Sequence, residues 1–446
     1  MFALRFKPLA LLLLLVLVGC SNLPLFSGGG SQSGTLVPAA SLAPTAASTG
    51  EAEQTPAVPD ATLEATLEAM GSLVRIWLPP EFDPDGDSPA SALLKARLEQ
   101  FTLENPDVRL DVRVKPLTGA GGLLEALTAT HVSAPLALPD LVLLPRPMLE
   151  SAALKGLLST YDGLTTRMDD PGWFPYAQQL ARVETSIYGL PFAGDALVLA
   201  YRPTQTGITP NNLEEILSLG EVLLFPAADP QALFTLSTYL DAGGSLQDAD
   251  GRPELDQAIL TKVLEFDQRA SSGGMMPSWL TQYSEDGQVW DAFMRDQNPM
   301  AITWASTFLE SPPDSSGELV MKSMPAWEGT PFTLANGWSW ALTGQDPARQ
   351  ALSVRLAEFF LEKEFLAAWT EAAGYLPPTE DALHGWQDAS LRQAIEQVSN
   401  SAQLIPPADL VSSLGPALEQ ALVKVLKAES DPLSAAATAI DQIHQP

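Results

Sequence analysis

Cysteine and histidine are scarce in this chain of 446 residues, which contains one cysteine and three histidines. A single cysteine excludes an intramolecular disulfide and a thiolate metal cluster. His131, His384 and His444 are isolated, so no metal-ligand spacing and no Ser-His-Asp order stands out. We therefore expect no metal, no cofactor and no catalytic constellation.

Positive charge is the second shortage, because 24 Lys and Arg stand against 54 Asp and Glu, and the net charge is −30. Proteins bind nucleic acids mainly through Lys and Arg contacts to phosphates, so no nucleic-acid partner is expected. Charged residues make up only 17% of the chain and hydrophobic residues 46%, which excludes wholesale disorder. The 38 prolines and 31 glycines indicate many turns, and the length favours more than one globular domain.

Long apolar runs are missing except near the amino terminus. A positive segment with Arg5 and Lys7 precedes an apolar run over 9–18, which is too short to span a bilayer comfortably. The following segment, Leu17-Val18-Gly19-Cys20, resembles the lipobox of bacterial lipoproteins. The resemblance implies a signal peptide over 1–19 and a diacylated Cys20 at the start of the mature chain. The alternative is an ordinary secretory signal with an incidental cysteine.

Residues 20–72 have a different composition, rich in Pro, Ala, Thr, Ser and Gly and almost free of aromatic residues. Such a segment buries too little apolar surface to offset the entropy lost on ordering its backbone. After the lipidated cysteine, we expect it to be a flexible tether that lets an anchored globule work away from the membrane.

Folded sequence is expected from Leu73, where strands and helices alternate. Apolar runs and period-two alternation predict the strands, and apolar residues at helical spacing predict the helices. The alternation predicts an α/β fold in which helices cover both faces of a parallel sheet. The expected elements are strands at 74–78, 108–114 and 140–144, and helices at 88–101, from 123 onward, at 410–426 and at 432–443.

Short motifs follow one another through the folded part, and six of them are Pro139-Asp140-Leu141-Val142, Tyr188-Gly189-Leu190-Pro191-Phe192, Ala200-Tyr201-Arg202, Pro299-Met300-Ala301-Ile302-Thr303-Trp304, Asn336-Gly337-Trp338-Ser339-Trp340 and Gly374-Tyr375-Leu376-Pro377. In this order and spacing they resemble family 1 extracellular solute-binding proteins, the maltose-binding-like receptors of ABC importers. The resemblance covers residues 73–383. The chain departs from the family after Arg202-Pro203, where an Asn-Lys pair is usual, which bears on the ligand more than on the fold.

The resemblance implies an α/β, two-lobed fold of the type II periplasmic-binding-protein class, each lobe a sheet flanked by helices and joined to the other by hinge strands. The first lobe is expected to comprise 73–194 and 299–333, and the second 195–298 and 334–446. Doubly wound sheets bind ligands beyond the carboxyl ends of their strands, and two facing lobes close by hinge motion. A solute enclosed between the lobes is therefore expected.

A sugar presents an apolar face and a rim of hydroxyls, so its site needs aromatic platforms together with carboxylates, amides or Arg. Ten tryptophans are available as platforms. The alternative for each tryptophan is packing in a core or at its rim; for Asp195 it is capping a turn, and for Arg146 a surface ion pair. Trp338 and Trp340 share one strand face if 336–342 is extended. The candidate ligand-binding residues are Trp77, Arg146, Asp195, Trp304, Trp338, Trp340 and Tyr375.

These features predict a monomeric, lipid-anchored substrate-binding protein of an ABC importer on the extracytoplasmic side of the cell membrane, at the cell surface or in the periplasm. It would capture a small-molecule solute, expected to be a sugar or oligosaccharide, and deliver it to the permease subunits. One alternative is a cell-surface polysaccharide hydrolase that uses two carboxyl groups. Another is a ligand-sensing binding protein. Turnover of a chromogenic glycoside would favour the hydrolase, and neighbouring permease genes would favour transport over sensing.

Overall fold

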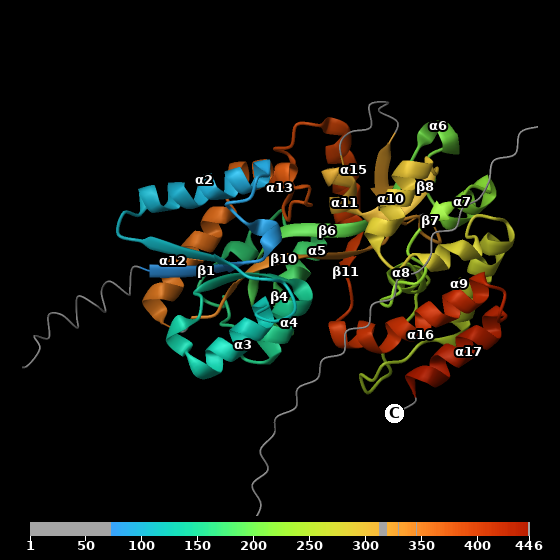
Figure 1. Ribbon diagram of the computed structural model, residues 1–446, viewed down its shortest axis with the longest axis horizontal. Coiled ribbons are helices and arrows are strands. Elements are labelled where there is room, and N and C mark those ends of the chain that lie inside the picture. The colour runs from blue at the N-terminus through green and yellow to red at the C-terminus, as the bar shows by residue number, and fades with distance from the viewer. Residues whose placement is uncertain (1–72, 312–318, 329, 345, 445–446) are drawn as a thin grey trace, which may run out of the picture. The chain divides into compact units, whose positions relative to one another are not determined.

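The computed structural model describes residues 73–446 except 312–318, 329, 345 and 445–446 (Figure 1). The signal peptide expected over 1–19 and the tether expected over 20–72, including Cys20, lie outside the described residues. Helices and strands alternate through the described part, as the sequence predicts, and most strands join one nine-stranded mixed sheet.

The main sheet has the strand order β2-β1-β3-β10-β6-β8-β7, with β9 paired to β6 and β11 paired to β10, and β4 and β5 form a separate hairpin. The strands are β1 (Leu73–Leu78), β2 (Arg109–Val114), β3 (Leu141–Pro145), β4 (Arg182–Val183), β5 (Ser186–Ile187), β6 (Gly189–Tyr201), β7 (Leu223–Leu224), β8 (Met300–Trp304), β9 (Val320–Ser323), β10 (Thr333–Leu342) and β11 (Ala402–Leu404). β1 is parallel to β2 and β3, as expected, whereas β10 runs antiparallel to β3 and β6. The expectation of a parallel sheet is therefore wrong for the sheet as a whole, because the long strands β6 and β10 return through it in opposite directions.

Helices follow most of the strands. The helices are α2 (Pro89–Glu104), α3 (Leu123–Ser133), α4 (Arg146–Leu154), α5 (Pro175–Leu180), α6 (Pro203–Thr206), α7 (Leu213–Leu219), α8 (Leu233–Asp241), α9 (Gln257–Ser272), α10 (Asp286–Asp296), α11 (Ala305–Glu310), α12 (Pro347–Phe360), α13 (Lys363–Ala373), α14 (Glu380–Leu383), α15 (Ala389–Ser401), α16 (Ala408–Leu426) and α17 (Pro432–Ile443). The strands and helices expected from the sequence are confirmed within a few residues, including the two terminal helices.

Alternate residues of the first strands point to opposite faces of the sheet. Val74 and Ile76 of β1 belong to a large hydrophobic cluster, which we call the first core, and which also contains residues of α2, α12 and α13. Trp77, one position further along, belongs to a smaller cluster with residues of α3 and α4. Because side chains alternate along a strand, helices cover both faces of this sheet.

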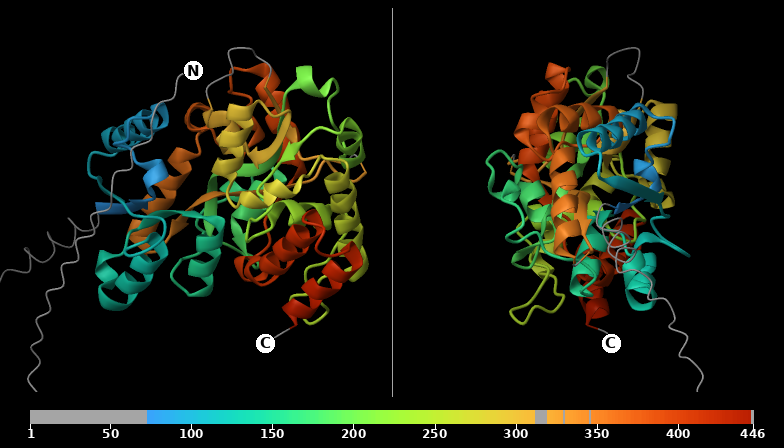
Figure 2. Two further views of the ribbon diagram at one scale, coloured as in Figure 1. Left: turned by 45° about the vertical axis from the view of Figure 1, so that its right-hand side comes forward. Right: turned by 90° about the vertical axis from the view of Figure 1, so that its left-hand side faces the viewer.

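A second hydrophobic cluster, which we call the second core, contains residues of β7 and β8 together with α8, α9, α10, α16 and α17. The helices α16 and α17, red in both figures, pack against each other and against α9 (Figures 1 and 2). The fold therefore has two cores, each built on part of the sheet and covered by helices.

Two strands connect the cores. In β6, Ala196 and Val198 belong to the first core, whereas Leu197 and Leu199 belong to the second. In β10, Ala335 belongs to the first core and Leu334 to the second. Seven residue pairs join β6 to β10 side by side. The family resemblance implies crossings near 192–197 and 332–336, and β6 and β10 run through these two ranges. Their role as hinge strands stays a prediction.

The cores group two segments differently from the lobe boundaries expected above. Met300, Ala301 and Ile302 pack in the second core, because β8 pairs with the part of β6 that has already crossed. Buried residues from 335–402 pack mainly in the first core, because β10 returns to pair with β3. The lobe boundaries themselves stay a prediction.

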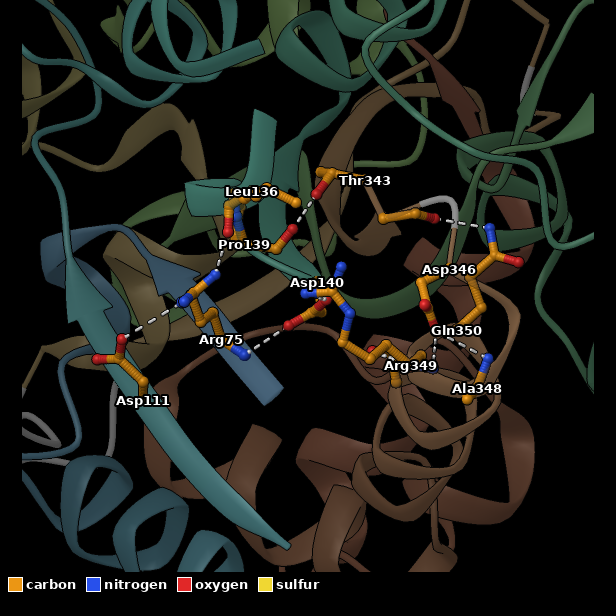
Figure 3. Close-up of polar contacts among 12 residues, drawn as sticks. Arg75, Asp111, Leu136, Pro139, Asp140, Thr343, Asp346, Ala348, Arg349 and Gln350 are labelled. Atoms are coloured by element: carbon orange, nitrogen blue, oxygen red, sulfur yellow. Dashed lines mark hydrogen bonds and ion pairs between the residues drawn. The ribbon is translucent and has the colours of Figure 1, made fainter. Parts of the chain in front are cut away.

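A polar network anchors the end of β10 to the start of β3 (Figure 3). The Asp140 carboxylate accepts a hydrogen bond of 2.8 Å from the backbone N–H of Arg75 and lies 3.3 Å from the Arg349 guanidinium. Thr343 donates to the carbonyl oxygen of Pro139. Burial raises the pKa of Asp140 above its ordinary value, and the nearby arginines oppose that shift. The Pro139-Asp140 motif therefore has a structural role, at the end of β3 away from Arg146.

Candidate solute site

One pocket of about 290 Å³ lies at the edge of the second core, where β7 and β8 end. These two strands are parallel, so their carboxyl ends meet at the same edge of the sheet. We call it the Trp304 pocket. It is lined by Leu197, Pro226, Asp229, Gln231, Leu233, Phe234, Ser284, Glu285, Asp286, Ile302 and Trp304.

The Trp304 pocket combines an aromatic ring with acidic groups. Trp304 is half-buried, as are Asp229 and Asp286, whereas Glu285 is exposed. Asp286 accepts hydrogen bonds from Thr303 Oγ1 at 3.1 Å and from Thr307 Oγ1 at 2.7 Å. Burial raises the pKa of Asp286, and these hydrogen bonds oppose the shift. An aromatic face beside hydrogen-bond acceptors is the chemistry expected for a saccharide ring.

A second pocket of about 280 Å³, which we call the Arg146 pocket, lies between α4 and α16. Arg146 opens α4 directly after β3, and Asn336 comes from the crossing strand β10. The remaining walls come from the segment before α8 and from α16. The pocket is lined by Arg146, Pro147, Glu150, Pro230, Gln231, Asn336, Ile405, Pro406, Ala408, Val411, Ser412 and Pro416.

Backbone carbonyl groups hold the Arg146 guanidinium at this pocket. Its Nη1 donates to the carbonyl oxygens of Gln179 at 3.2 Å and Leu180 at 3.3 Å, and also to that of Arg182. Burial lowers the pKa of Arg146, and the nearby Glu150 carboxylate opposes the shift. Arg146 forms no ion pair among the described residues, so the expected alternative of a surface ion pair does not describe it.

The two pockets meet at Gln231, which lines both of them and is exposed. One pocket is formed mainly by the second core, and the other includes α4, which packs in the smaller cluster against β1 and β3. Two small pockets that share a residue, one at the edge of the second core and the other reaching α4, form the candidate ligand site in the described part of the chain. We call them together the paired pockets.

Asp195 lies beside the paired pockets in β6, opposite Asn336 of β10. Its carboxylate accepts hydrogen bonds from the backbone N–H of Ser306 at 3.0 Å, from Ser306 Oγ at 2.6 Å and from the N–H of Ala196 at 2.9 Å. Burial raises the pKa of Asp195 to about 7 although these hydrogen bonds favour the charged form. The carboxylate therefore caps α11, and its contact with a solute stays a prediction.

Tyr375 reaches the same part of β6 through its neighbour Leu376. Two backbone hydrogen bonds of 2.8 Å join Leu376 to Gly194. The Tyr375 ring stacks on Phe82 at 5.7 Å, and Phe82 contacts Trp338 edge-on at 4.8 Å, both between ring centroids. Burial raises the pKa of Tyr375, and the Asp195 carboxylate adds to the shift. The structure thus brings Asp195, Trp338 and Tyr375 into one neighbourhood, in which the two aromatic residues are half-buried.

Trp77 and Trp340 occupy hydrophobic clusters instead. Trp77 is 3% exposed, packs in the smaller cluster and has the Lys115 ammonium group 4.8 Å from its ring centroid. Trp340 is fully buried and stacks on Phe360 at 4.6 Å. Neither lines the paired pockets. Their burial favours the core-packing alternative, and a solute contact at either position stays a prediction.

Sequence reasoning missed three polar residues of the paired pockets. Asn336 stands in the same motif as Trp338 and Trp340, but only the two tryptophans were predicted as ligand contacts. Asp286 opens α10 and gave no sign of facing a pocket, because acidic residues are common at helix starts. Gln231 carried no signal at all, since a single amide in a turn has no characteristic pattern. No group of three or more His, Cys, Asp and Glu suited to a metal ion occurs among the described residues.

The family model for bacterial extracellular solute-binding proteins matches residues 96–394. The chain belongs to this family. Its members bind solutes, so this solute-binding protein is not an enzyme, and the hydrolase considered from the sequence is set aside.

Relatives of this solute-binding protein include a lactose-binding protein from Rhizobium radiobacter, which is 24% identical over 299 residues. The match covers 59% of this chain and 64% of that relative, so the chain spans less than two thirds of its length. Among solved structures, the cyclic alpha-maltosyl-1,6-maltose binding protein from Arthrobacter globiformis has a TM-score of 0.68 at 18% identity, with 83% of this chain and 97% of that chain covered.

The sugar-binding protein MalE from Xanthomonas citri has a TM-score of 0.69 at 20% identity and covers 83% of this chain and 97% of its own. These likenesses confirm the expected two-lobed α/β fold. The family also indicates an extracytoplasmic location for this solute-binding protein. Among the described residues, no helix has the length and apolar character needed to cross a membrane.

Proposed function

We propose that this solute-binding protein captures a sugar or oligosaccharide in the paired pockets and delivers it to an ABC permease. The observation that carries the proposal is the composition of the pockets. The Trp304 ring offers a platform for the apolar face of a sugar, while Asp286, Gln231 and Asn336 offer acceptors and donors for its hydroxyl groups.

Hinge closure is the proposed mechanism. The paired pockets take residues of α4, which follows β3 on one side of the crossing strands β6 and β10, and residues at the ends of β7 and β8 on the other side, so a bound solute would touch both parts of the molecule. A ligand shifts an open–closed equilibrium only by its differential affinity for the closed state. Contacts that form with both sides supply that difference, and the closed shape would then dock on the permease.

The amino-terminal segment completes the proposal. Lipid attached to Cys20 would hold the protein at the outer side of the cell membrane, and residues 20–72 would act as a tether that raises its concentration near the permease. A Cys20→Ser variant should leave the membrane fraction and lose the mass of the lipid in mass spectrometry. Wild-type protein that carries no lipid on Cys20 would contradict the anchor and leave the solute site untouched.

Calorimetric titration with maltose, maltotetraose and lactose tests the solute site. We expect one of these saccharides to bind, to raise the melting temperature and to change tryptophan fluorescence. Trp304→Ala should weaken binding by about fivefold, because stacking on one aromatic ring contributes roughly 1 kcal/mol. Trp279→Ala is the matched control, since Trp279 is 39% exposed and lines neither pocket.

Two results would contradict the saccharide proposal. One is the absence of any heat, melting shift or fluorescence change across the panel. The other is equal binding by wild type and Trp304→Ala, which would move the saccharide away from the Trp304 pocket. If the protein forms its complex with a membrane protein other than a permease, ligand sensing would explain its role better than transport.

A further inference from the structure

The helix α16 carries the two residues least suited to a helix interior next to each other. Gly415 and Pro416 stand in the middle of this 19-residue helix. Glycine loses the most backbone freedom in a helix, and proline lacks the N–H that the helical hydrogen bond needs. Positions that break local rules within a well-formed element are expected where function requires them. What Gly415 and Pro416 contact therefore indicates why they are present.

Gly415 packs directly on the backbone of the turn that carries Gln231. A Cβ atom at position 415 would overlap the carbonyl oxygen of Pro230 and stand 3.0 Å from the Cα atom of Gln231. Both atoms belong to the backbone, so neither moves aside as a flexible side chain would. Gly415 has an ordinary helical φ, so the close contact is the reason for glycine here and conformational freedom is not.

Pro416 and Ser412, one turn apart, both line the Arg146 pocket. Because proline has no N–H, it cannot donate to the carbonyl oxygen of Ser412 four residues earlier. The Ser412 hydroxyl group donates its hydrogen to the carbonyl oxygen of Ala408 at 2.6 Å, so it does not replace the missing backbone hydrogen bond. The proline thus weakens the helix at the wall of the pocket that Gln231 shares.

The turn itself is also held in an unusual conformation. Ala232 has a φ of 49°, in the left-handed region that residues other than glycine rarely adopt. The Asp229 carboxylate accepts hydrogen bonds from the N–H groups of Gln231 at 2.9 Å and Leu233 at 3.1 Å. Strain of this kind persists only where surrounding contacts over-determine the backbone, and it gathers at ligand sites.

We infer that Gln231 is a specificity-determining contact for the solute and that Gly415 is the residue that positions it. The inference rests on the proposed function. The Gln231 side chain lines both pockets and has no hydrogen-bond partner among the described residues. An amide offers both a donor and an acceptor, so it can bind two neighbouring hydroxyl groups of one saccharide. Gly415, Ala232 and Asp229 fix where that amide stands.

A double-mutant cycle in the full-length protein tests the inference, with binding measured by calorimetry for maltose, maltotetraose and lactose. Gln231→Ala should weaken binding of the saccharide that wild type binds by about tenfold, and Gly415→Ala by a similar factor. Because Gly415 acts through Gln231, the double variant should bind about as weakly as either single variant. Gln231→Glu removes the amide donor and should change the ratio of affinities across the panel.

Ser413→Ala is the matched control on the same helix, because Ser413 is exposed and lines neither pocket. It should bind like wild type. Thermal unfolding shows whether Gly415→Ala is folded, and the exposed Gln231→Ala carries the test if it is not. The inference is wrong if Gln231→Ala binds with wild-type affinity, or if the fold-loss of the double variant equals the product of the two single fold-losses. Either result leaves the proposed function standing. A wild-type protein that binds no saccharide removes the proposed function and the inference with it.

Discussion

The first and second cores differ in whether their residues line the paired pockets. Four tryptophans are buried in the first core, and none of its residues lines either of the paired pockets. The second core buries one tryptophan, and its members Leu197, Phe234 and Ile302 form walls of the Trp304 pocket. In the first core, large aromatic rings stack on one another and fill the space between them. In the second core, the ends of β7 and β8 and the turn before α8 leave a pocket at its edge.

The comparison shows that a tryptophan does not by itself mark a sugar platform. Trp340 and Trp304 both stand in motifs that resemble the expected family, Trp340 in the crossing strand β10 and Trp304 at the end of β8, which pairs with β6. Trp340 is enclosed by Phe192 and Phe360, with centroid distances of 5.5 Å and 4.6 Å. Trp304 ends its strand and is half-buried at a pocket. The neighbours across the fold, rather than the residue type, decide between the two roles.

The largest expected effect comes from emptying the first core. Trp340→Ala should lower the free energy of unfolding by about 3–5 kcal/mol, because it removes a buried ring and leaves a cavity among aromatic neighbours. Urea unfolding at neutral pH measures the loss. Trp304→Ala, the matched change at the pocket, should cost less than about 1 kcal/mol of stability. Equal losses in the two variants would break the distinction between core and platform.

The second core has its own sensitivity, to pH, through Asp267. This side chain is 1% exposed, and neither carboxylate oxygen has a hydrogen-bond partner among the described residues. Burial raises the pKa of Asp267 to about 8. The folded state therefore keeps a proton that the unfolded chain releases near its ordinary pKa of 3.8, and stability is full below that value and falls as the pH rises toward about 8.

We expect the free energy of unfolding to decrease by a few kcal/mol, on the order of 1.4 kcal/mol for each pH unit, between about pH 5 and pH 8. Asp267→Asn cannot ionise and should remove the contribution of Asp267 to this slope. Asp195, with a pKa raised to about 7, contributes in the same direction and keeps its part in that variant. Urea unfolding at several pH values provides the measurement, and an unchanged slope in Asp267→Asn would mean that the second core does not control it.

The smallest effect is expected where the two cores join. Ser306→Ala removes the hydroxyl group that donates to Asp195 and should lower stability by about 1 kcal/mol, as for the loss of one ordinary hydrogen bond. The backbone N–H of Ser306 remains as a partner. If Asp195 also contacts the solute, Asp195→Asn should weaken saccharide binding while Ser306→Ala leaves it within about twofold. If Asp195→Asn and Ser306→Ala bind the saccharide with equal affinity, Asp195 only caps α11 and does not contact the solute.

Much of the fold could be predicted because its signals are local. The strand at 74–78 and the helix at 88–101 follow from apolar spacing within a few residues, and β1 and α2 confirm them. The crossings near 192–197 and 332–336 followed from a resemblance in motif order. The residues of the paired pockets were only partly predicted, because Gln231, Asp286 and Asn336 meet through contacts between segments far apart in the chain.

The sequence by itself determined the composition class, the alternation of strands and helices, and the likeness to a family of solute-binding proteins. These properties depend on neighbours in the chain or on motif order, so they can be read without coordinates. Only the tertiary structure decided that Trp340 is enclosed while Trp304 lines a pocket, that the Asp195 carboxylate caps α11, and that Gly415 presses on the turn of Gln231. The physical reason is that burial and partners come from packing between distant segments, which no local pattern specifies.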